Sequence, residues 1–520
     1  MPDDTTPVPP DTDLDGIVRV PGTFYDPREP YGSAQFLPDW PEPFVRVPVL
    51  RVPYLAENGN HPADPTGGHP PGEVDVVVVG AGLAGLTAAA VAARAGVRVA
   101  VLDSRRPGGR AATTVVDPGV VFNAGPRALY RAGAAWRVLT SLGIAPRGEV
   151  PPTEGHAVRD GEVHEMPGTP LKLLRSRLLS RTSKVRLARV LGGLQRLDPA
   201  RFDDMSLDRW LRDQRLDHDA RELVRTTVRI VTYVDDLELS SGTAIRQLQL
   251  GLGRGKGVLY LDDGWQQLVD ALLAELGRLG VPVLSGRSVR AVEPARPAGS
   301  SEPGWLVRTA RTAGVAGAED RDAQDGAAVP AELRAGSVVV AMGTPAAAAA
   351  VLPVPLDLSG LGPAATAACL ELAVRRPPRF RFLQGIGDPL YLSSHSPIAR
   401  LGPDGLQVVH VMRYGARSTA EDRPALWEHA ARAGIREDDV VAHRFLHSMT
   451  VMGGIPIGEA GGQAGRPPVE VPGPAGLYVA GDWVGAEGLL ADASFASGER
   501  AGQLAAQRAR AARPAAMAAR

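Results

Sequence analysis

Three glycines that follow a run of valines constrain the fold of this chain more than any other feature. Residues 76–79 are all valine, which is typical of a central parallel strand. Residues 86–95 are rich in alanine and have helical character, and residues 97–102 resemble a second strand. This order predicts a βαβ unit of about thirty residues. The glycines of its first turn are Gly80, Gly82 and Gly85.

Each glycine of this turn has its own physical role. Gly80 permits a tight turn, Gly82 lets the backbone approach a pyrophosphate, and Gly85 allows close packing of helix on strand. The phosphates would lie at the helix N-terminus, where N–H groups have no helical partner. Asp103 ends the second strand, where an acid binds ribose hydroxyls. The unit therefore predicts a bound dinucleotide, and the alternative is a glycine-rich turn of an ordinary α/β protein.

Length, charge and cysteine content narrow the class of protein. The 520 residues suit two domains, and the 44% of apolar residues can bury a sizeable core. Lys+Arg 57 nearly balances Asp+Glu 58, so the composition gives no global attraction for nucleic acid. The single cysteine, Cys369, excludes an internal disulfide and favours a reducing cytoplasm. We expect a cytoplasmic protein, because the N-terminal residues lack a secretory signal pattern and turn residues interrupt the apolar stretch 338–356.

Further motifs extend this interpretation along the chain. Residues 108–110 read Gly-Gly-Arg, residues 122–130 contain Gly125-Pro-Arg, and residues 477–482 read Leu-Tyr-Val-Ala-Gly-Asp. Together with the glycine turn, they resemble the flavin-containing superfamily of phytoene desaturases, amine oxidases and protoporphyrinogen oxidases. The resemblance covers residues 74–510 in order and is closest to the phytoene-desaturase side. This chain departs from the family pattern in having Asp103 where glutamate is usual, and in a spacer before Gly108 that is one residue short.

The resemblance implies FAD as the cofactor. In the family, the Gly-Gly-Arg loop runs beside the flavin, and the C-terminal motif closes its site. A helix that opens at Ala493 and Ser494 would direct its positive dipole toward the flavin. Cys369 lies outside the sequence context of covalent attachment, so we expect non-covalent FAD. The residues expected to bind it are Gly80, Gly82, Gly85, Asp103, Gly108, Gly109, Arg110, Gly125, Val289, Gly481, Asp482, Ala493 and Ser494.

The expected fold is α/β, with a Rossmann-like FAD-binding domain of the GR2 type assembled from discontinuous segments and an inserted mixed α+β substrate domain. Residues 151–245 have mostly helical patterns, and residues 311–330 resemble a surface loop. The predicted division is a proline-rich arm at 1–73, an FAD-binding domain at 74–150, 246–345 and 471–510, a substrate-binding domain at 151–245 and 346–470, and a flexible tail at 511–520.

The chemistry that the resemblance implies is hydride transfer from a substrate C–H to flavin N5. The preferred function is a desaturase or dehydrogenase of an apolar or polyene substrate, with oxygen or a quinone as electron acceptor. The alternatives are an amine oxidase, a redox-neutral flavin-dependent isomerase, and a flavin-free binding protein like the Rab GDP-dissociation inhibitors. Trp265, Gln266 and Gln267 follow the position of the family's Gly-Gly turn and are candidates for the substrate cavity. The alternative is that Trp265 is a core residue and both glutamines face solvent.

Three other features leave alternatives open. Several amine oxidases hold a water beside the flavin with a lysine, and none of the three lysines, Lys172, Lys184 and Lys256, can be placed there. His443 and His447 suit a helical face or a strand, and without further ligands no metal site is predicted. Residues 171–197 combine leucines with basic residues and contain no acid. This segment is either an interfacial helix at a membrane or, as we prefer, a helical lid with a solvated basic face.

Overall fold

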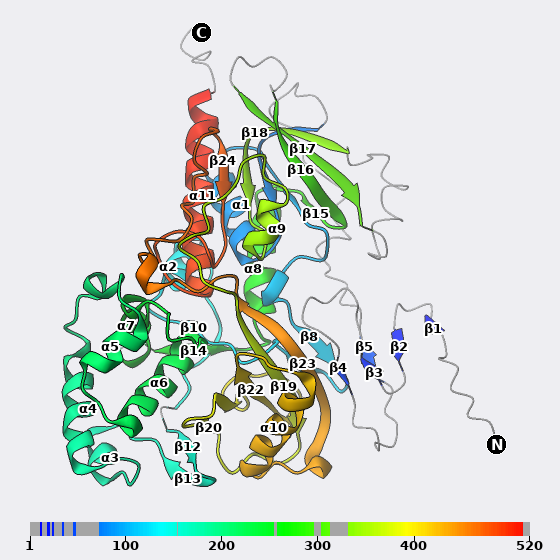
Figure 1. Ribbon diagram of the computed structural model, residues 1–520. Coiled ribbons are helices and arrows are strands. Elements are labelled where there is room, and N and C mark those ends of the chain that lie inside the picture. Colours follow the sequence, from blue (N-terminus) through cyan, green and yellow to red (C-terminus); the bar gives the residue numbers. More distant parts are fainter. Residues whose placement is uncertain are drawn as a thin grey trace.

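We describe the protein from a computed structural model (Figure 1). The structure describes residues 72–152, 154–253, 257–295, 303–312 and 331–512, together with the backbone of five short N-terminal strands. The predicted N-terminal arm, most of the predicted loop 311–330 and the end of the predicted tail lie outside the described residues. The five short strands are β1 (Asp11–Thr12), β2 (Val18–Val20), β3 (Thr23–Phe24), β4 (Ala34–Gln35) and β5 (Val45–Val47).

The first of two seven-stranded sheets contains the valine run. Its strand order is β15-β7-β6-β18-β17-β16, and β24 also pairs with β18. The pairs among β15, β7, β6, β18 and β24 are parallel, whereas β17 pairs antiparallel with both β18 and β16. The strands are β6 (Glu73–Val79), β7 (Val99–Leu102), β15 (Val283–Leu284), β16 (Arg287–Ala295), β17 (Gly304–Arg311), β18 (Glu332–Val340) and β24 (Leu477–Val479).

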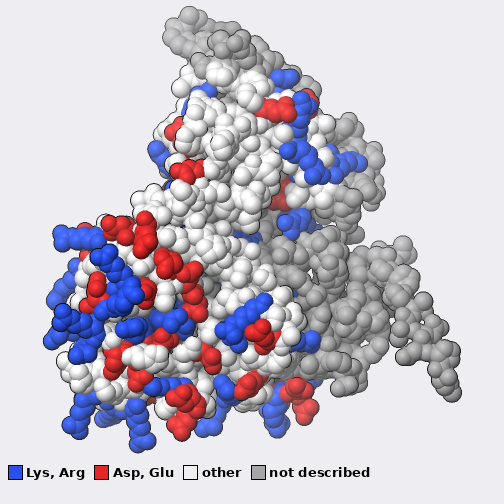
Figure 2. Space-filling model, viewed as in Figure 1, with Lys and Arg blue, Asp and Glu red and all other residues white. Residues whose placement is uncertain are grey.

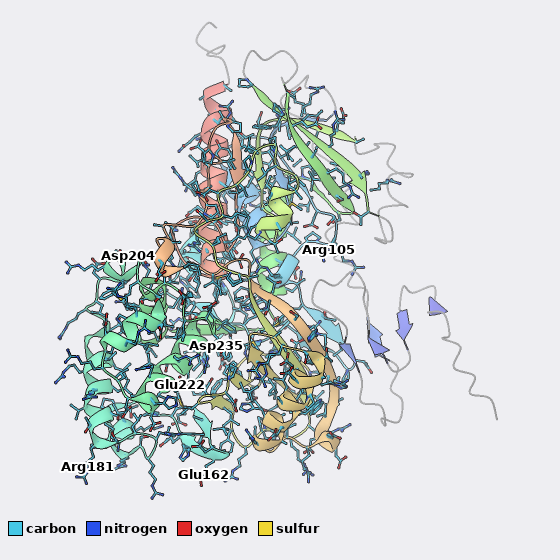
Figure 3. The ribbon with its side chains drawn as sticks, viewed as in Figure 1. Arg105, Glu162, Arg181, Asp204, Glu222 and Asp235 are labelled. Atoms are coloured by element: carbon cyan, nitrogen blue, oxygen red, sulfur yellow. The ribbon has the colours of Figure 1, made fainter. Side chains whose placement is uncertain are left out.

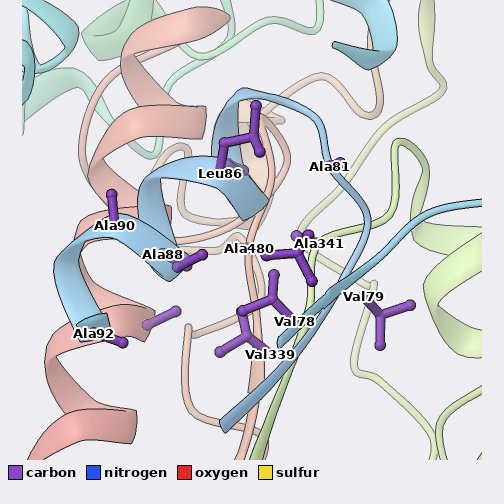
Figure 4. Close-up of a cluster of buried hydrophobic side chains, with 14 of the residues drawn as sticks. Val78, Val79, Ala81, Leu86, Ala88, Ala90, Ala92, Val339, Ala341 and Ala480 are labelled. Carbon is purple, nitrogen blue, oxygen red and sulfur yellow. The ribbon is translucent and has the colours of Figure 1, made fainter. Parts of the chain in front are cut away.

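Helices with small side chains pack against this sheet. Ala88 and Ala92 of α1 lie over Val78 and Val339 of the neighbouring strands (Figure 4). A Cβ at Gly498 of α11 would overlap the carbonyl oxygen of Ala84, so the two helices approach closely. The helices of this part are α1 (Leu83–Arg94), α2 (Ala134–Ser141), α8 (Gln266–Arg278), α9 (Pro345–Ala349) and α11 (Ala491–Ala512), with the 3-10 turn η2 (Gly109–Ala111).

The second sheet has the order β13-β12-β20-β21-β22-β19-β23, and α10 packs against it (Figure 1). Its central strands are almost entirely buried, as the continuous pattern of β19 shows. The elements are β12 (His156–Arg159), β13 (Glu162–Glu165), β19 (Ala365–Val374), β20 (Phe382–Gly385), β21 (Leu390–Ser394), β22 (Gln407–Tyr414), α10 (Thr419–Arg432), η4 (Glu437–Asp439), β23 (Val440–Met452) and η5 (Gly458–Ala460).

A helical layer lies beside the second sheet and has its own core, which includes Trp210 and Leu211 (Figure 1). Its elements are α3 (Pro170–Arg175), α4 (Arg181–Leu194), η3 (Pro199–Phe202), α5 (Leu207–Asp213), α6 (His218–Thr232) and α7 (Ser241–Leu252). Short strands connect the parts of the molecule, namely β8 (Thr114–Val116), β9 (Val120–Phe122), β10 (Leu129–Tyr130), β11 (Gly148–Glu149) and β14 (Val258–Leu261).

The predicted α/β class is confirmed, and local differences have physical reasons. Residues 151–245 begin with the hairpin β12–β13, which joins the second sheet and which the helical pattern did not indicate. The segment 171–197 is two helices, because Ser180 caps a new helix by accepting from the N–H of Ser183. The C-terminal helix begins at Ala491, two residues before Ala493, where it is predicted to open. Among the helices of the described residues, none is both long and apolar enough to cross a bilayer.

Candidate functional site

The glycine turn between β6 and α1 is tightly packed on two sides. Gly80 has φ 104°, a conformation that favours glycine, and a Cβ there would lie 2.5 Å from the carbonyl oxygen of Ala341. A Cβ at Gly85 would overlap the carbonyl oxygen of Gly80. Both positions therefore need glycine because neighbouring backbone occupies the space of a side chain.

Gly82 differs from its two neighbours. Its backbone is extended (φ −80°, ψ −179°), and a Cβ there would meet no atom within 4 Å. Gly82 is the N-cap of α1, where no side chain caps the helix, and the first turn contains no acid. The N–H groups of the first turn of α1 thus have no side-chain cap, which is the arrangement that binds phosphate at a helix N-terminus.

Asp103 and the Gly-Gly-Arg loop lie beside this turn. The Asp103 carboxylate accepts from the N–H of Ala81 at 2.7 Å and of Arg105 at 2.8 Å. Burial raises the pKa of this carboxyl, and the two N–H donors act in the opposite direction. The N–H of Gly108 donates to the Ala81 carbonyl at 2.8 Å, so the two loops run side by side. Asp103 therefore holds the turn in shape in addition to its predicted contact with ribose.

The strand that carries Val289 begins next to Asp103. The N–H of Arg287, the first residue of β16, donates to the Asp103 carbonyl at 2.8 Å. Val289 follows two residues later, is 7% exposed and belongs to the core of the first sheet. The structure thus brings Val289 to the neighbourhood of Asp103, as its predicted contact with FAD requires.

An ion pair joins the two ends of the predicted site. Arg110 Nη1 lies 2.7 Å from Asp482 Oδ2 and also donates to the Val451 carbonyl at 3.2 Å. Asp482 Oδ2 accepts from the N–H of Gly453 at 3.2 Å as well. Asp482 Oδ1 is buried and has no hydrogen-bond partner among the described residues. The sequence indicated Arg110 and Asp482, but it did not indicate that they pair across 372 positions. It also did not indicate that backbone groups at the end of β23 bind both side chains.

The start of α11 lies against this strand end. Ser497 Oγ accepts from the N–H of Gly481 and lies 3.0 Å from the Gly481 carbonyl oxygen. Ala493 is fully buried, and Ser494 Oγ donates to the Leu490 carbonyl at 3.3 Å. Both predicted residues therefore lie in the first turn of a helix that is fixed to the C-terminal motif.

Asp492 is a buried carboxylate that sequence reasoning missed. Its Oδ1 accepts from the N–H of Ala135 at 2.8 Å and so caps α2, and the close approach of Gly133 leaves no space for a Cβ. Burial, with a smaller effect of Glu487, raises the pKa of Asp492 to about 7. A single aspartate before a helical segment gave no signal of this role.

The segment with Gly125 is held by a buried charge network that the sequence did not reveal. Ala124 and Gly125 both have positive φ, 55° and 91°, and the N–H of Gly125 donates to Glu371 Oε1 at 3.0 Å. The other oxygen of Glu371, Oε2, lies 2.7 Å from Arg444 Nε. Burial alone would raise the pKa of Glu371, but Arg444, His410 and the Gly125 N–H together lower it to about 2. Glu371 therefore stays ionised and fixes the Gly125 backbone.

Arg127 links this segment to the Gly-Gly-Arg loop. Its guanidinium donates to the carbonyl oxygens of Asn123 at 2.6 Å and Arg110 at 2.5 Å, and lies 5.7 Å from the ring centre of Trp265. The motif around Gly125 and the loop that carries Arg110 are thus one connected structure.

The three candidates for the substrate cavity have structural partners. Trp265 is 4% exposed in the core of the first sheet, and its backbone N–H donates to Asn123 Oδ1 at 2.9 Å. Gln266 donates to Asp270 at 2.9 Å, and the Gln267 amide contacts the backbone of Arg147 at both ends. In this arrangement both glutamine amides are engaged by protein partners, so neither is free to orient a ligand. The role of the three residues toward substrate stays a prediction.

A cluster of buried aromatic and sulfur-containing side chains lies next to Gly125. A Cβ at Gly125 would be 2.6 Å from Met449 Cε, and Cys369 Sγ is 3.9 Å away. We call this the tyrosine cluster; its members are Ala124, Tyr233, Ala367, Cys369, Tyr391, Met412, Tyr414, Leu446, Met449 and Val451. Met449 and Val451 stand two residues apart on β23, so the cluster extends to the Arg110 and Asp482 pair.

Within this cluster, three tyrosine rings pack together. The ring centres of Tyr391 and Tyr414 are 6.3 Å apart, and those of Tyr233 and Tyr414 are 6.1 Å apart. Tyr233 has φ 60°, a left-handed conformation that bulky residues rarely adopt. Tyr414 Oη is buried and has no hydrogen-bond partner among the described residues. Burial raises the pKa of Tyr414 well above its ordinary value, so its hydroxyl remains protonated.

The remaining titratable candidates lie elsewhere. Lys172 pairs with Glu165 at 2.8 Å and Lys184 donates to the Leu174 carbonyl, both in the helical layer, while Lys256 is outside the described residues. His443 and His447 lie in β23, and burial lowers the pKa of His443 to about 4. In the part of the chain that the structure describes, no group of three ligating side chains could hold a metal.

The residues present fit FAD in two respects that do not depend on the resemblance. The open side of Gly82, at an uncapped helix N-terminus, suits the pyrophosphate. The buried and unpartnered Oδ1 of Asp482 would accept a hydrogen bond from a hydroxyl of the cofactor.

Comparisons with known proteins agree with this geometry. The family model described as "Flavin containing amine oxidoreductase" matches residues 83–506. A protein of Mycobacterium tuberculosis named "Putative flavin-containing monoamine oxidase AofH" is 33% identical over an alignment of 254 residues that covers 43% of this chain and 52% of that protein. The chain thus matches only about half the length of this relative.

Solved structures share the fold. A putrescine oxidase with bound putrescine superposes with a TM-score of 0.59 at 18% identity, over 84% of this chain and 99% of that one. Cyclohexylamine oxidase from Brevibacterium oxydans gives a TM-score of 0.58 at 18% identity with the same coverage. The family match over most of the chain implies FAD as the cofactor, and the chain belongs to the family of flavin-containing amine oxidoreductases.

Proposed function

We propose that the first sheet and its helices bind FAD non-covalently, and that the chain oxidises a small amine with a largely apolar body in the tyrosine cluster. FAD, when bound, supplies the hydride acceptor for a substrate C–H bond. In this proposal the N-terminus of α1 binds the pyrophosphate, Asp103 binds ribose, and Asp482 accepts from the cofactor. The segments 74–150, 246–345 and 471–510 form the cofactor domain, and the second sheet covers the substrate.

The unpartnered hydroxyl of Tyr414 is the observation that carries the choice of an amine over a polyene. A buried hydroxyl without a partner costs about 1–3 kcal/mol, and a hydrocarbon substrate would leave it unpaired. An amine N–H donates to Tyr414 Oη, while the rings of Tyr391 and Tyr414 contact the apolar body.

The second candidate is the desaturase of an apolar or polyene substrate that the sequence motifs favour. The apolar lining of the cluster, with Cys369, Met412 and Met449 all buried, supports it. Among the described residues, Lys172 and Lys184 both lie in the helical layer and make no contact with the predicted flavin site, so neither holds the position of the lysine that some amine oxidases place there. An isomerase or a flavin-free binding protein finds no separate support in the geometry.

Anaerobic reduction of the purified flavoprotein tests the proposal. Benzylamine, cyclohexylamine, putrescine and a detergent-dispersed polyene are each added, and the loss of flavin absorbance is followed. We expect reduction by at least one monoamine, and Tyr414→Phe should raise its half-saturating concentration about ten-fold by removing one hydrogen bond. Tyr478→Phe, a buried tyrosine of β24 outside the cluster, is the matched control. Reduction by the polyene alone would overturn the amine assignment.

A further inference from the structure

The helices α3 and α4 present apolar and basic side chains to solvent on one corner of the molecule. Leu171 is 55% exposed, Leu174 is 69% exposed and Val185 is 62% exposed, and all three lie in these two short helices. Lys184 Nζ donates to the Leu174 carbonyl at 2.8 Å, which fixes the two helices side by side. With Leu191 of α4, these three side chains make up four of the six large hydrophobic side chains that the described residues expose.

The buried side of the same helices explains why these residues face outward. In α4, Ser183, Leu187 and Leu194 are buried at helical spacing and pack into the helical layer. Val185 lies on the opposite face, and in α3 the buried residue is Leu173, between the exposed Leu171 and Leu174. The exposed leucines are thus a second apolar surface and not a continuation of the core.

Basic residues surround this apolar surface. Residues 171–197 contain eight arginines and lysines and no acid. Figure 2 shows Lys and Arg side chains projecting at this corner, with Asp and Glu side chains between some of them, and Figure 3 places Arg181 at its outer edge. Five of the arginines are exposed and have no ion pair with a described residue: Arg175, Arg177, Arg181, Arg189 and Arg196.

We propose that this corner, which we call the α3–α4 surface, docks the protein onto a membrane that contains anionic lipids. An acidic protein or nucleic acid would need the arginines, but its charged groups would gain little from the exposed Leu171 and Leu174. A bilayer interface binds both kinds of side chain, because leucines enter the boundary between headgroups and acyl chains while arginines remain among anionic headgroups. The structure thus favours the interfacial alternative for this segment over the solvated lid.

The membrane assignment is independent of the proposed substrate. It accounts for the exposed leucines whether the chain oxidises an amine or a polyene, and its test does not use activity. Failure of the amine assay leaves the docking proposal in place, and failure of docking leaves the flavin site in place.

Vesicle co-sedimentation of the full-length flavoprotein tests the proposal. Vesicles of phosphatidylcholine with roughly a third phosphatidylglycerol should sediment the protein, and pure phosphatidylcholine should not. Each arginine near the surface contributes roughly five-fold to the partition, so Arg175→Gln/Arg181→Gln/Arg189→Gln should weaken binding on the order of a hundred-fold. Leu171→Asn/Leu174→Asn should weaken it as well, at unchanged flavin content.

Two exposed residues elsewhere provide matched controls for each class of change. Arg290→Gln/Arg500→Gln removes exposed arginines from β16 and α11, and Val150→Asn/Leu252→Asn removes exposed apolar side chains that are 51% exposed each. Both double variants should bind vesicles like the parent protein. The proposal is overturned if the parent protein ignores anionic vesicles. It is also overturned if the leucine variant binds them normally, since only charge would then matter and a soluble acidic partner would explain the surface.

Discussion

Replacement of Gly82 by valine should remove FAD without unfolding the protein. The backbone of Gly82 is extended, which suits valine, and a Cβ there meets no atom within 4 Å. The cost to folding is therefore limited to the poor capping preference of valine, about 1 kcal/mol. In the complex, however, the valine side chain occupies the space of the pyrophosphate. Loss of two charge-assisted hydrogen bonds, about 1.5–3 kcal/mol each, corresponds to a roughly 10²–10⁴-fold weaker affinity for FAD.

Two other glycine variants separate cofactor binding from folding. Gly192→Val places the same side chain on the exposed face of α4, where a Cβ also meets nothing within 4 Å, and should leave FAD content unchanged. Gly85→Ala forces a Cβ into the Gly80 carbonyl and should lower the melting temperature of the apoprotein itself. FAD released per chain and thermal unfolding are measured for all three. A folded Gly82→Val protein that retains one FAD per chain would refute the assignment of the phosphate site.

The remaining predictions concern the buried carboxylates. Glu371→Gln leaves Arg444 buried without its counter-charge and should lower the free energy of unfolding by about 3–5 kcal/mol, measured with urea; an unchanged midpoint would contradict this. Because burial raises the pKa of Asp492 to about 7, its contribution to stability is present below pH 4 and lost as the pH rises through 7. The free energy of unfolding should therefore fall less steeply between about pH 4 and pH 8 in Asp492→Asn than in the parent protein. An equal slope of unfolding free energy against pH in the variant and the parent would be inconsistent with a buried, protonated Asp492.

The sequence predicted those parts of the molecule that are formed by residues close together in the chain. The valines before Gly80 and the alanines after Gly85 have one reasonable arrangement, so the first βαβ unit follows from residues close in the chain. The hairpin β12–β13 was missed because its strands are short and are stabilised by pairing with β20, more than two hundred residues away.

The electrostatic connections of the site could not be read from the sequence. Glu371 and Arg444 are 73 positions apart, and neither belongs to a motif. Arg110 and Asp482 belong to two separate motifs, but only the folded chain shows that they form a pair. The exposure of Leu171 and Leu174 also depends on which helical face the rest of the layer covers, which the sequence alone does not show.

Release of flavin from the purified protein tests the central claim most directly. The protein is denatured, precipitated chain is removed, and the flavin in the supernatant is identified and counted by absorbance and chromatography. The structure predicts one FAD per chain in the supernatant, because the site offers an anion-binding helix end at Gly82 and a buried acceptor at Asp482. A protein that carries no flavin and takes up none when folded in the presence of excess FAD would contradict the account.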